Sequence, residues 1–362
     1  MTGPVVPRRL APVGSPPSAR PLLLLLLALA LASPGCTEEG GALPDLGILT
    51  DQAIAVADAP AGCSPTDPRS APLQLGVQPD EGEKAYVDII ARARKSLRVF
   101  AYLMGTGGVL DGLKTQAVKG LDVRVILDVG NQSVNTKYQK DLVAAGAQAI
   151  WSDSAFANMH AKVIVGDDQE ALISTGNFAL SYMKTERNFT ARTSDPKDVA
   201  TLTALFDADW RRQAPNLSCT RLLVAPTNSR PRLLDLINQA KSSLAIESMQ
   251  FADTDIRSAV AARQKAGVEV RVLIAAASWV DANADAATFL KGAGIPVRWL
   301  DSPAVHTKDI IVDGKVAYLG SINLSNTSIS KNREVGTIVT EAANVQRMLS
   351  TFEKDWAAAT PF

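Results

Sequence analysis

Two short stretches of this 362-residue chain share one pattern: MHAKVIVGD at residues 159–167 and VHTKDIIVD at residues 305–313. Each reads His-x-Lys-x4-Asp. Each is followed, at the same distance, by a hydroxyl residue, one further residue and an asparagine, in STGN (174–177) and GSIN (320–323). The chain contains only two histidines, and both lie in these stretches. We therefore expect the two copies to act together in one site.

The two motif copies lie inside a longer internal repeat. Apolar, strand-like runs alternate with helix-like stretches in both halves of the chain, and His160 and His306 are separated by 146 positions. Alternating α and β elements with apolar strands predict a largely buried sheet covered by helices. We therefore expect an α/β fold of two tandem domains, 73–215 and 216–362, each ordered as helix, strand, helix, strand, helix, short strand, hairpin and helix. A pseudo-two-fold relation between them brings the two histidines together.

Each motif is expected to begin a β-hairpin. The runs at 163–165 and 310–312 consist of Val and Ile, which favour strands. Residues i and i+2 of a strand share a face, so the histidine and lysine of each motif point the same way. This pairing joins His160 with Lys162 and His306 with Lys308.

The turn of each hairpin predicts which residues face each other across it. Asp313-Gly314 is a strong two-residue hairpin sequence, and strand pairing outward from it places Lys308 opposite Leu319 and His306 opposite Ser321. With Asp167-Asp168 as the equivalent turn, a hydroxyl and an amide join each histidine: Thr175 and Asn177 in the first copy, Ser321 and Asn323 in the second. Asp167 and Asp313 fall in the turns, where Asp side chains bond nearby backbone, so we interpret both as structural.

The duplicated pattern resembles the motif of the phospholipase D superfamily, and the resemblance covers residues 73–360. It implies a duplicated mixed sheet between helices, with the active site at the interface of the two halves. It also implies an enzyme that acts on phosphodiester bonds. The superfamily includes phospholipases D, cardiolipin and phosphatidylserine synthases, endonucleases and DNA-repair phosphodiesterases.

The residue types of the motif suit phosphodiester chemistry. Displacing an alkoxide requires a nucleophile, an acid for the leaving oxygen and positive charge around the phosphoryl oxygens. A neutral imidazole is a good nucleophile near pH 7 and an imidazolium is a good acid, so one histidine on each side of phosphorus supplies both roles. Water, or an alcohol in transphosphatidylation, then attacks the phosphohistidine. The expected catalytic residues are His160, Lys162, Asn177, His306, Lys308, Asn323 and Glu334, supported by Thr175, Ser321 and Asn188.

The copies differ downstream, where the first has Glu186-Arg187-Asn188 and the second has Asn332-Arg333-Glu334. Counting from each histidine, Asn188 corresponds to Glu334. In the superfamily an acidic residue near this position holds the histidine by its second nitrogen, so we expect Glu334 to back His306. Asn188 can accept the same hydrogen bond without the charge. A carboxylate partner favours imidazolium, which makes His306 the acid and His160 the nucleophile. The chain has no further histidine cluster, so no metal and no cofactor are expected.

Several other residues carry open alternatives. Glu247 and Gln250 end a strand of the second half, where strand ends approach a site, so they are candidates for substrate contact. Tryptophans of the repeat favour core packing over lipid contact, and the arginines downstream of the motifs can either reach phosphate or form salt bridges. These residues are Trp151, Trp299, Arg187 and Arg333.

The N-terminus has the pattern of an export signal. Three arginines precede an apolar run at 22–32, which is too short to span a bilayer, so residues 1–35 are expected to be a signal peptide. Small residues before Cys36 resemble a lipoprotein cleavage site, with ordinary secretory cleavage as the alternative. Residues 36–72 are expected to form a flexible linker. In an oxidising compartment Cys63 and Cys219 can form a disulfide, the alternative being two free thiols.

The charge balance of the chain limits the classes of binding partner and substrate that we expect. The chain has 37 basic and 37 acidic residues, and removal of the signal peptide leaves an acidic excess. This balance excludes binding of long nucleic acid by bulk charge. We expect an exported monomer of the bacterial envelope, lipid-anchored or secreted, with no transmembrane helix in the mature chain. Its predicted reaction is hydrolysis or transphosphatidylation of phospholipid at a membrane surface. The alternatives are a secreted nuclease acting on DNA or RNA, and an inactive surface-binding protein.

Overall fold

The computed structural model describes residues 62–362, which lie within one compact unit. The expected signal peptide at 1–35, Cys36 and most of the expected linker lie outside the described residues. The first half contains β1 (Gln74–Gln78), α1 (Lys84–Arg92), β2 (Ser96–Ala101), α2 (Gly108–Val118), β3 (Asp122–Leu127), a 3-10 turn (Val129–Asn131), α3 (Gln132–Ala144), β4 (Gln148–Trp151), β5 (Lys162–Gly166), β6 (Glu170–Ser174), α4 (Leu180–Thr185), β7 (Glu186–Thr193) and α5 (Pro196–Trp210).

The second half repeats this order. It contains β8 (Leu223–Ala225), α6 (Ser229–Asn238), β9 (Ser243–Ser248), α7 (Thr254–Lys265), β10 (Glu269–Ile274), α8 (Asn283–Gly292), β11 (Val297–Trp299), β12 (Ala304–Val305), β13 (Lys308–Val312), β14 (Val316–Gly320), α9 (Asn326–Ser330), β15 (Glu334–Val339), α10 (Ala342–Ala358) and β16 (Thr360–Pro361). The expected α/β order is therefore confirmed, and each hairpin is followed by a short helix and a further strand that the sequence pattern missed.

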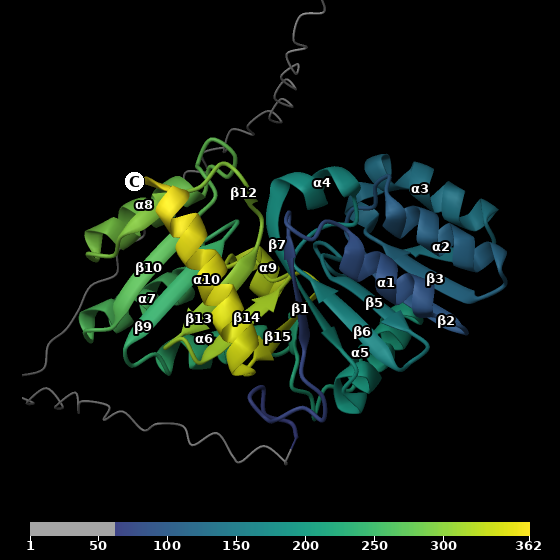
Figure 1. Ribbon diagram of the computed structural model, residues 1–362, viewed down its shortest axis with the longest axis horizontal. Coiled ribbons are helices and arrows are strands. Elements are labelled where there is room, and N and C mark those ends of the chain that lie inside the picture. Colours follow the sequence, from purple (N-terminus) through teal and green to yellow (C-terminus); the bar gives the residue numbers. More distant parts are fainter. Residues whose placement is uncertain (1–61) are drawn as a thin grey trace, which may run out of the picture. The chain divides into compact units, whose positions relative to one another are not determined.

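Each half forms one mixed sheet. The first has the order β1-β7-β6-β5-β2-β3-β4, and the second has the order β16-β11-β10-β9-β13-β14-β15-β8. In both, the parallel strands that precede the motif pair with its hairpin: β2 with β5, and β9 with β13. β12 of the second half pairs with β7 of the first sheet, so the two halves are joined by strand pairing as well as by packing. Figure 1 shows α10 lying across the second sheet, next to β13 and β14.

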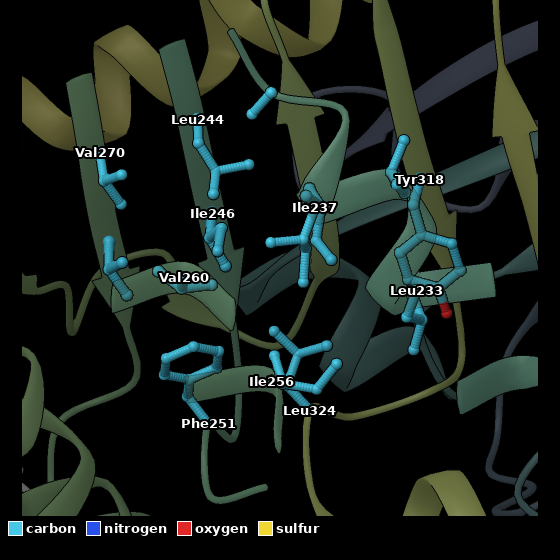
Figure 2. Packing of buried hydrophobic residues seen from close by; sticks show 14 of the residues in the cluster. Leu233, Ile237, Leu244, Ile246, Phe251, Ile256, Val260, Val270, Tyr318 and Leu324 are labelled. Carbon is cyan, nitrogen blue, oxygen red and sulfur yellow. The ribbon is translucent and has the colours of Figure 1, made fainter. Parts of the chain in front are cut away.

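Helices cover the sheets because their apolar residues recur every three or four positions. In α7, Ile256 and Val260 lie on one face, and the helix begins where the Asp253 carboxylate accepts the first amides. Figure 2 shows these two residues in one cluster with Ile246 and Val270 of the neighbouring strands. Burying each such side chain contributes about 1.5–3 kcal/mol. Trp151 and Trp299 pack against the cores of their halves, as expected.

The hairpin turns occur where expected, but the strand register differs by one residue. Asp313 and Gly314 both have positive φ, and the Lys315 amide donates to the Val312 carbonyl oxygen at 2.9 Å. Lys315 is then left over as a bulge, so Val312 pairs with Val316. The same shift occurs in the first hairpin, where Gly166 pairs with Glu170.

The bulge overturns the predicted cross-strand partners. Leu319 pairs with Asp309, not with Lys308, and β14 ends at Gly320, before Ser321. Lys308 instead lies opposite Ser248 of β9. The predicted register was therefore wrong, and Ser321 and Asn323 are placed by the loop beyond the strand; Asn177 and Asn323 still line the cavity with the histidines, whereas Thr175 and Ser321 do not.

The motif aspartates connect the hairpin turns to the neighbouring central strands. The Asp313 carboxylate accepts the amides of Ser242 and Ser243 at 2.8 and 2.9 Å, and Asp167 accepts those of Lys95 and Ser96 at 2.7 and 2.9 Å. These amides lie about 70 residues earlier in the chain, rather than next to the turn. The structural interpretation of both aspartates agrees with these contacts, and their role is to join two segments distant in sequence.

The chain is already packed before residue 73. Cys63 is buried and forms a disulfide with Cys219, the pair expected from the sequence. The Arg69 guanidinium donates to Asp198 of α5 and to Thr337 of β15, each at 2.7 Å. The segment from 63 to 72 therefore ties the two halves together instead of forming a free linker.

Candidate active site

Both motif copies contribute to a single cavity of about 380 Å³. It is lined from the first half by His160 and Asn177 and from the second half by His306 and Asn323. The expectation that the copies meet, although they are far apart in sequence, agrees with this geometry. The two lysines of the motifs are buried behind the histidines, with exposed fractions of 1% and 0%.

Each histidine is held by the backbone of the opposite half. The His160 amide donates to the Arg333 carbonyl oxygen at 2.8 Å, and the His306 amide donates to the Arg187 carbonyl oxygen at 3.2 Å. Arg187 lies in β7, where it pairs with Val305, and Arg333 immediately precedes β15, where it forms an isolated parallel bridge with Met159. The site therefore forms only when the two sheets are packed together.

The side-chain partners of the histidines are crossed in the same way. The Glu334 carboxylate accepts a hydrogen bond from Nδ1 of His160 at 2.8 Å, and the Asn188 carboxamide oxygen accepts one from Nδ1 of His306 at 3.0 Å. The expectation that Glu334 backs His306 in its own half was therefore wrong. Counting along the sequence paired each histidine with the residue downstream of it, whereas the packing of the halves exchanges these residues.

A carboxylate and an amide occur beside both histidines, but in opposite order. In β7, Glu186 comes first and Asn188 second, with 3.2 Å between the Asn188 amide and the Glu186 carboxylate. At the start of β15, Asn332 comes first and Glu334 second, with 3.0 Å between the amide and the carboxylate. His160 consequently contacts a carboxylate directly, while the Glu186 carboxylate is 3.5 Å from the Nδ1 of His306, beyond the Asn188 amide.

Burial lowers the pKa of both imidazoles. Burial lowers the pKa of His160, and the Glu334 carboxylate opposes this shift. Burial lowers the pKa of His306 well below its usual value, and the nearby Lys308 and Lys162 lower it further. Lys308 Nζ lies 3.3 Å from His306 Nδ1. Both imidazoles are therefore neutral near pH 7 before an anion enters.

The two motif lysines are the buried basic groups of the site. Lys162 Nζ donates to the His160 carbonyl oxygen at 2.6 Å and lies 4.7 Å from the centre of the Tyr102 ring. Burial lowers the pKa of Lys162 well below its usual value and that of Lys308 to about 7. A phosphodiester anion placed between them favours their charged forms, so anion binding and proton uptake are coupled.

The pKa values of Glu334 and Glu186 are shifted in opposite directions. Burial raises the pKa of Glu334, but His160 and Lys162 overcome this, so the pKa is lowered and the group is ionised. Burial raises the pKa of Glu186, and its hydrogen bond from Asn188 only partly offsets the shift. The stronger anionic partner is thus the one bound to His160.

The hydroxyl and carboxamide residues predicted for the site differ in whether they line the cavity. Thr175 donates to the Asn188 oxygen at 2.8 Å and so orients the partner of His306. Ser321 forms hydrogen bonds with the Val335 backbone, and its side chain also forms one with Glu334, the partner of His160. Neither hydroxyl lines the cavity. The carboxamide oxygens of Asn177 and Asn323 are buried without a hydrogen-bond partner among the described residues, so both side chains are available to a bound group.

The other candidates for substrate or phosphate contact differ in whether they reach the cavity. Gln250 lines the cavity, but Glu247 is fully buried outside it. The two arginines form buried ion pairs across the halves rather than reaching the cavity: Arg187 with Asp355 and Arg333 with Asp209.

Three aromatic residues of the cavity were missed by the motif analysis. Tyr102 follows β2 and its ring lies 4.3 Å from the His160 ring, while Trp279 follows β10 and lies 6.3 Å from the His306 ring. Tyr182 of α4 also lines the cavity. The usable signal for Tyr102 and Trp279 was their position in the loops that follow repeat strands, where strand ends meet a site.

Residues 62–362 contain neither a membrane-spanning helix nor a metal-binding cluster of side chains. In that part of the chain, no helix combines the length and the apolar character needed to cross a bilayer. The same part has no cluster of three or more His, Cys, Asp or Glu side chains placed to hold a metal ion. The donors that converge on the cavity are imidazole, ammonium and carboxamide groups.

The duplicated fold and the site define the class of protein. Residues 86–210 and 233–356 each match the family described as "Cardiolipin synthase, PLD-like domain". The chain therefore belongs to the phospholipase D-like family, with two copies of the domain.

Individual relatives agree with this assignment. The chain is 32% identical over 167 residues to mitochondrial cardiolipin hydrolase of Mus musculus, covering 46% of this chain and 75% of the relative. It is 25% identical over 289 residues to cardiolipin synthase of Alkalihalophilus pseudofirmus, covering 68% and 58%. The fold is similar to that of phosphatidylserine synthase from Haemophilus influenzae, with a TM-score of 0.63 and 15% identity over 80% of this chain and 87% of that one.

Proposed function

We propose that this protein is a metal-independent enzyme that cleaves the headgroup phosphodiester bond of phospholipids. The phosphatidyl group is held on a phosphohistidine and is then transferred to water or to an acceptor alcohol. The observation that carries this proposal is the facing pair His160 and His306 in one cavity, each with Nδ1 bonded to an oxygen of the opposite half. Such a bond leaves the other ring nitrogen, Nε2, with its lone pair toward the cavity.

His160 is the proposed nucleophile. Its Nε2 attacks phosphorus, and the P–O bond to the leaving alcohol breaks. The phosphohistidine carries a positive imidazole, which the Glu334 carboxylate at 2.8 Å stabilises directly. The expected role of His160 is kept, but for a different reason, since Glu334 supports the nucleophile and not the acid.

His306 is the proposed acid. When a phosphodiester anion lies beside Lys162 and Lys308, its charge opposes the effect of the lysines on His306, so the imidazole can take up a proton. It gives that proton to the leaving oxygen. In the second step the neutral His306 accepts a proton from water or alcohol as its oxygen attacks phosphorus, and His160 leaves. The lysines stabilise the equatorial oxygens in both steps.

The substrate class follows from the relatives. A cardiolipin hydrolase and a cardiolipin synthase both act on lipid phosphodiesters by name, one with water and the other by transfer. We propose phospholipid as the substrate class of this chain as well, and the assay below determines whether the acceptor is water or an alcohol. Export to the bacterial envelope or beyond rests on residues 1–35 and Cys36, and fractionation with mass spectrometry of the mature N-terminus tests it.

The function is tested with the full mature protein and labelled phospholipid vesicles in excess EDTA. Formation of phosphatidic acid, or of a new phospholipid when glycerol is added, is the expected result. His160→Ala and His306→Ala should each lower the rate by at least about 10²-fold. Absence of any phospholipid turnover refutes the proposal, and cleavage of single-stranded DNA by the same preparation assigns the site to nucleic acid.

A further inference from the structure

The two sides of the cavity are chemically unequal. Beside His160 the Tyr102 ring makes an edge contact and the Glu334 carboxylate is bound by the imidazole, Ser328 and Asn332. All these polar groups have partners. Beside His306 the indole of Trp279 lies nearly parallel to the imidazole, at an angle of 29°, and 47% of its area is exposed.

A second exposed ring belongs to the His306 side. Tyr182 lines the cavity with 37% of its area exposed. It occupies the position in α4 that Ser328 occupies in α9, 146 residues later. Ser328 contacts Glu334, the partner of His160, so the repeat places Tyr182 next to β7 and the partner of His306. By this repeat relation Tyr182 of the first half belongs with the partner of His306, whereas Trp279 of the second half lies 6.3 Å from the His306 ring; both residues line the cavity.

The sides also differ in charge and polarisability. At the repeat position where the His160 side has Asn332, the His306 side has Glu186, whose carboxylate lines the cavity. At the position of Tyr102, it has Met249, whose sulfur lies 4.0 Å from Lys308 Nζ. The His306 side therefore adds a cavity-lining carboxylate, a thioether and exposed aromatic rings, whereas on the His160 side the carboxylate of Glu334 is fully buried and the cavity is lined by Tyr102 and neutral polar groups.

We propose that the His306 side is a subsite for a positively charged amino alcohol, such as the choline of a phosphatidylcholine headgroup. Aromatic faces and a nearby carboxylate are the groups that bind ammonium and quaternary ammonium ions in proteins. This inference rests on the proposed function, in which His306 protonates the leaving oxygen and the leaving alcohol therefore lies on its side. An acceptor alcohol enters the same subsite in the transfer reaction.

The test compares two headgroups on the same protein. The full mature chain is assayed on vesicles of phosphatidylcholine and of phosphatidylglycerol, and kcat/KM is taken for each. Wild-type protein should prefer phosphatidylcholine, and Trp279→Ala should lower that preference about tenfold, the effect of one cation–π contact in a partly desolvated site. Glu186→Asn, which copies the residue of the other half, should lower the preference in the same direction.

A matched control comes from the other side of the cavity. Tyr102→Ala should change both rates by a similar factor and leave the preference intact. Trp279→Phe keeps an aromatic face and should retain most of the preference, which separates loss of the ring from a disturbed fold. A wild-type preference for phosphatidylglycerol, or an unchanged preference in Trp279→Ala, overturns the proposal.

Direct binding decides the subsite independently of turnover. Free choline and free glycerol are titrated against the protein by saturation-transfer NMR. Choline should bind to wild type and lose affinity about tenfold in Trp279→Ala, and glycerol binding should not depend on the indole. If choline binds in this way but no phospholipid is cleaved, the proposed function fails and the subsite stands. If phospholipid is cleaved but the affinity for choline is the same in wild type and Trp279→Ala, the subsite proposal is refuted and the proposed function stands.

Discussion

The sharpest prediction concerns a buried carboxyl pair behind the second motif. Asp309 follows Lys308 in β13 and points away from the cavity, opposite Glu247 of β9 in the strand ladder. One Asp309 oxygen accepts from Thr307 at 2.7 Å, while the other, and both oxygens of Glu247, are buried without a partner in the described structure. The first half has Phe100 paired with Val163 at the equivalent place.

The pKa of Asp309 is raised from 3.8 to about 7: burial is the main cause and the Asp355 carboxylate adds to it, and together they outweigh the opposing effects of the Thr307 hydrogen bond, Arg187 and Lys308. Because the folded-state pKa is raised, the folded protein holds a proton that the unfolded chain has released. This stabilisation is complete below pH 3.8 and is lost as the pH rises to about 7. Between pH 5 and pH 7 the loss is about 2 kcal/mol, and it approaches about 3 kcal/mol by pH 8.

Asp309→Asn keeps the shape and the bond from Thr307 but cannot ionise. Its free energy of unfolding, measured by urea denaturation at several pH values, should therefore rise relative to wild type by about 3 kcal/mol between pH 5 and pH 8. Asp313→Asn is the matched control. Backbone amides lower the pKa of Asp313, so its removal should cost more stability as the pH rises.

The reasoning fails if the difference in unfolding free energy between Asp309→Asn and wild type does not change with pH. It also fails if that difference becomes less favourable to the variant at high pH. Either result shows that the carboxyl is ionised in the folded protein, with a cation or water compensating for it.

Three further predictions concern the site and the fold. Glu334→Gln removes the charge beside His160 and should lower kcat at least about tenfold; rapid-quench labelling should show slower phosphorylation of His160, and unchanged labelling would contradict the crossed pairing. The exchange Glu186→Asn with Asn188→Glu places a carboxylate on His306; its basicity should increase, and the alkaline limb of the kcat–pH profile should move to higher pH. Cys219→Ser opens the Cys63–Cys219 bridge and should cost about 2–5 kcal/mol in urea unfolding, a loss that the reduced wild type must share.

Local sequence features were enough for the architecture and for most of the lining of the site. The duplicated motif placed His160 and His306 in one cavity, and apolar runs separated by helix-like stretches gave the α/β order. Asp313-Gly314 located its turn, because positive φ at two adjacent positions is a local preference. These features depend on neighbours in sequence, which is why the sequence determined them.

The chemistry of the two histidines was decided by tertiary structure alone. Glu334 contacts His160 and Asn188 contacts His306 because β7 and Arg333, immediately before β15, each pair with the other half's chain, and no spacing within one half encodes that exchange. The contacts of Asp167 and Asp313 with backbone amides about 70 positions earlier likewise depend on the packing of distant segments. Contacts between distant segments form only when the whole chain packs, so the sequence determined the parts of this site and packing determined their partners.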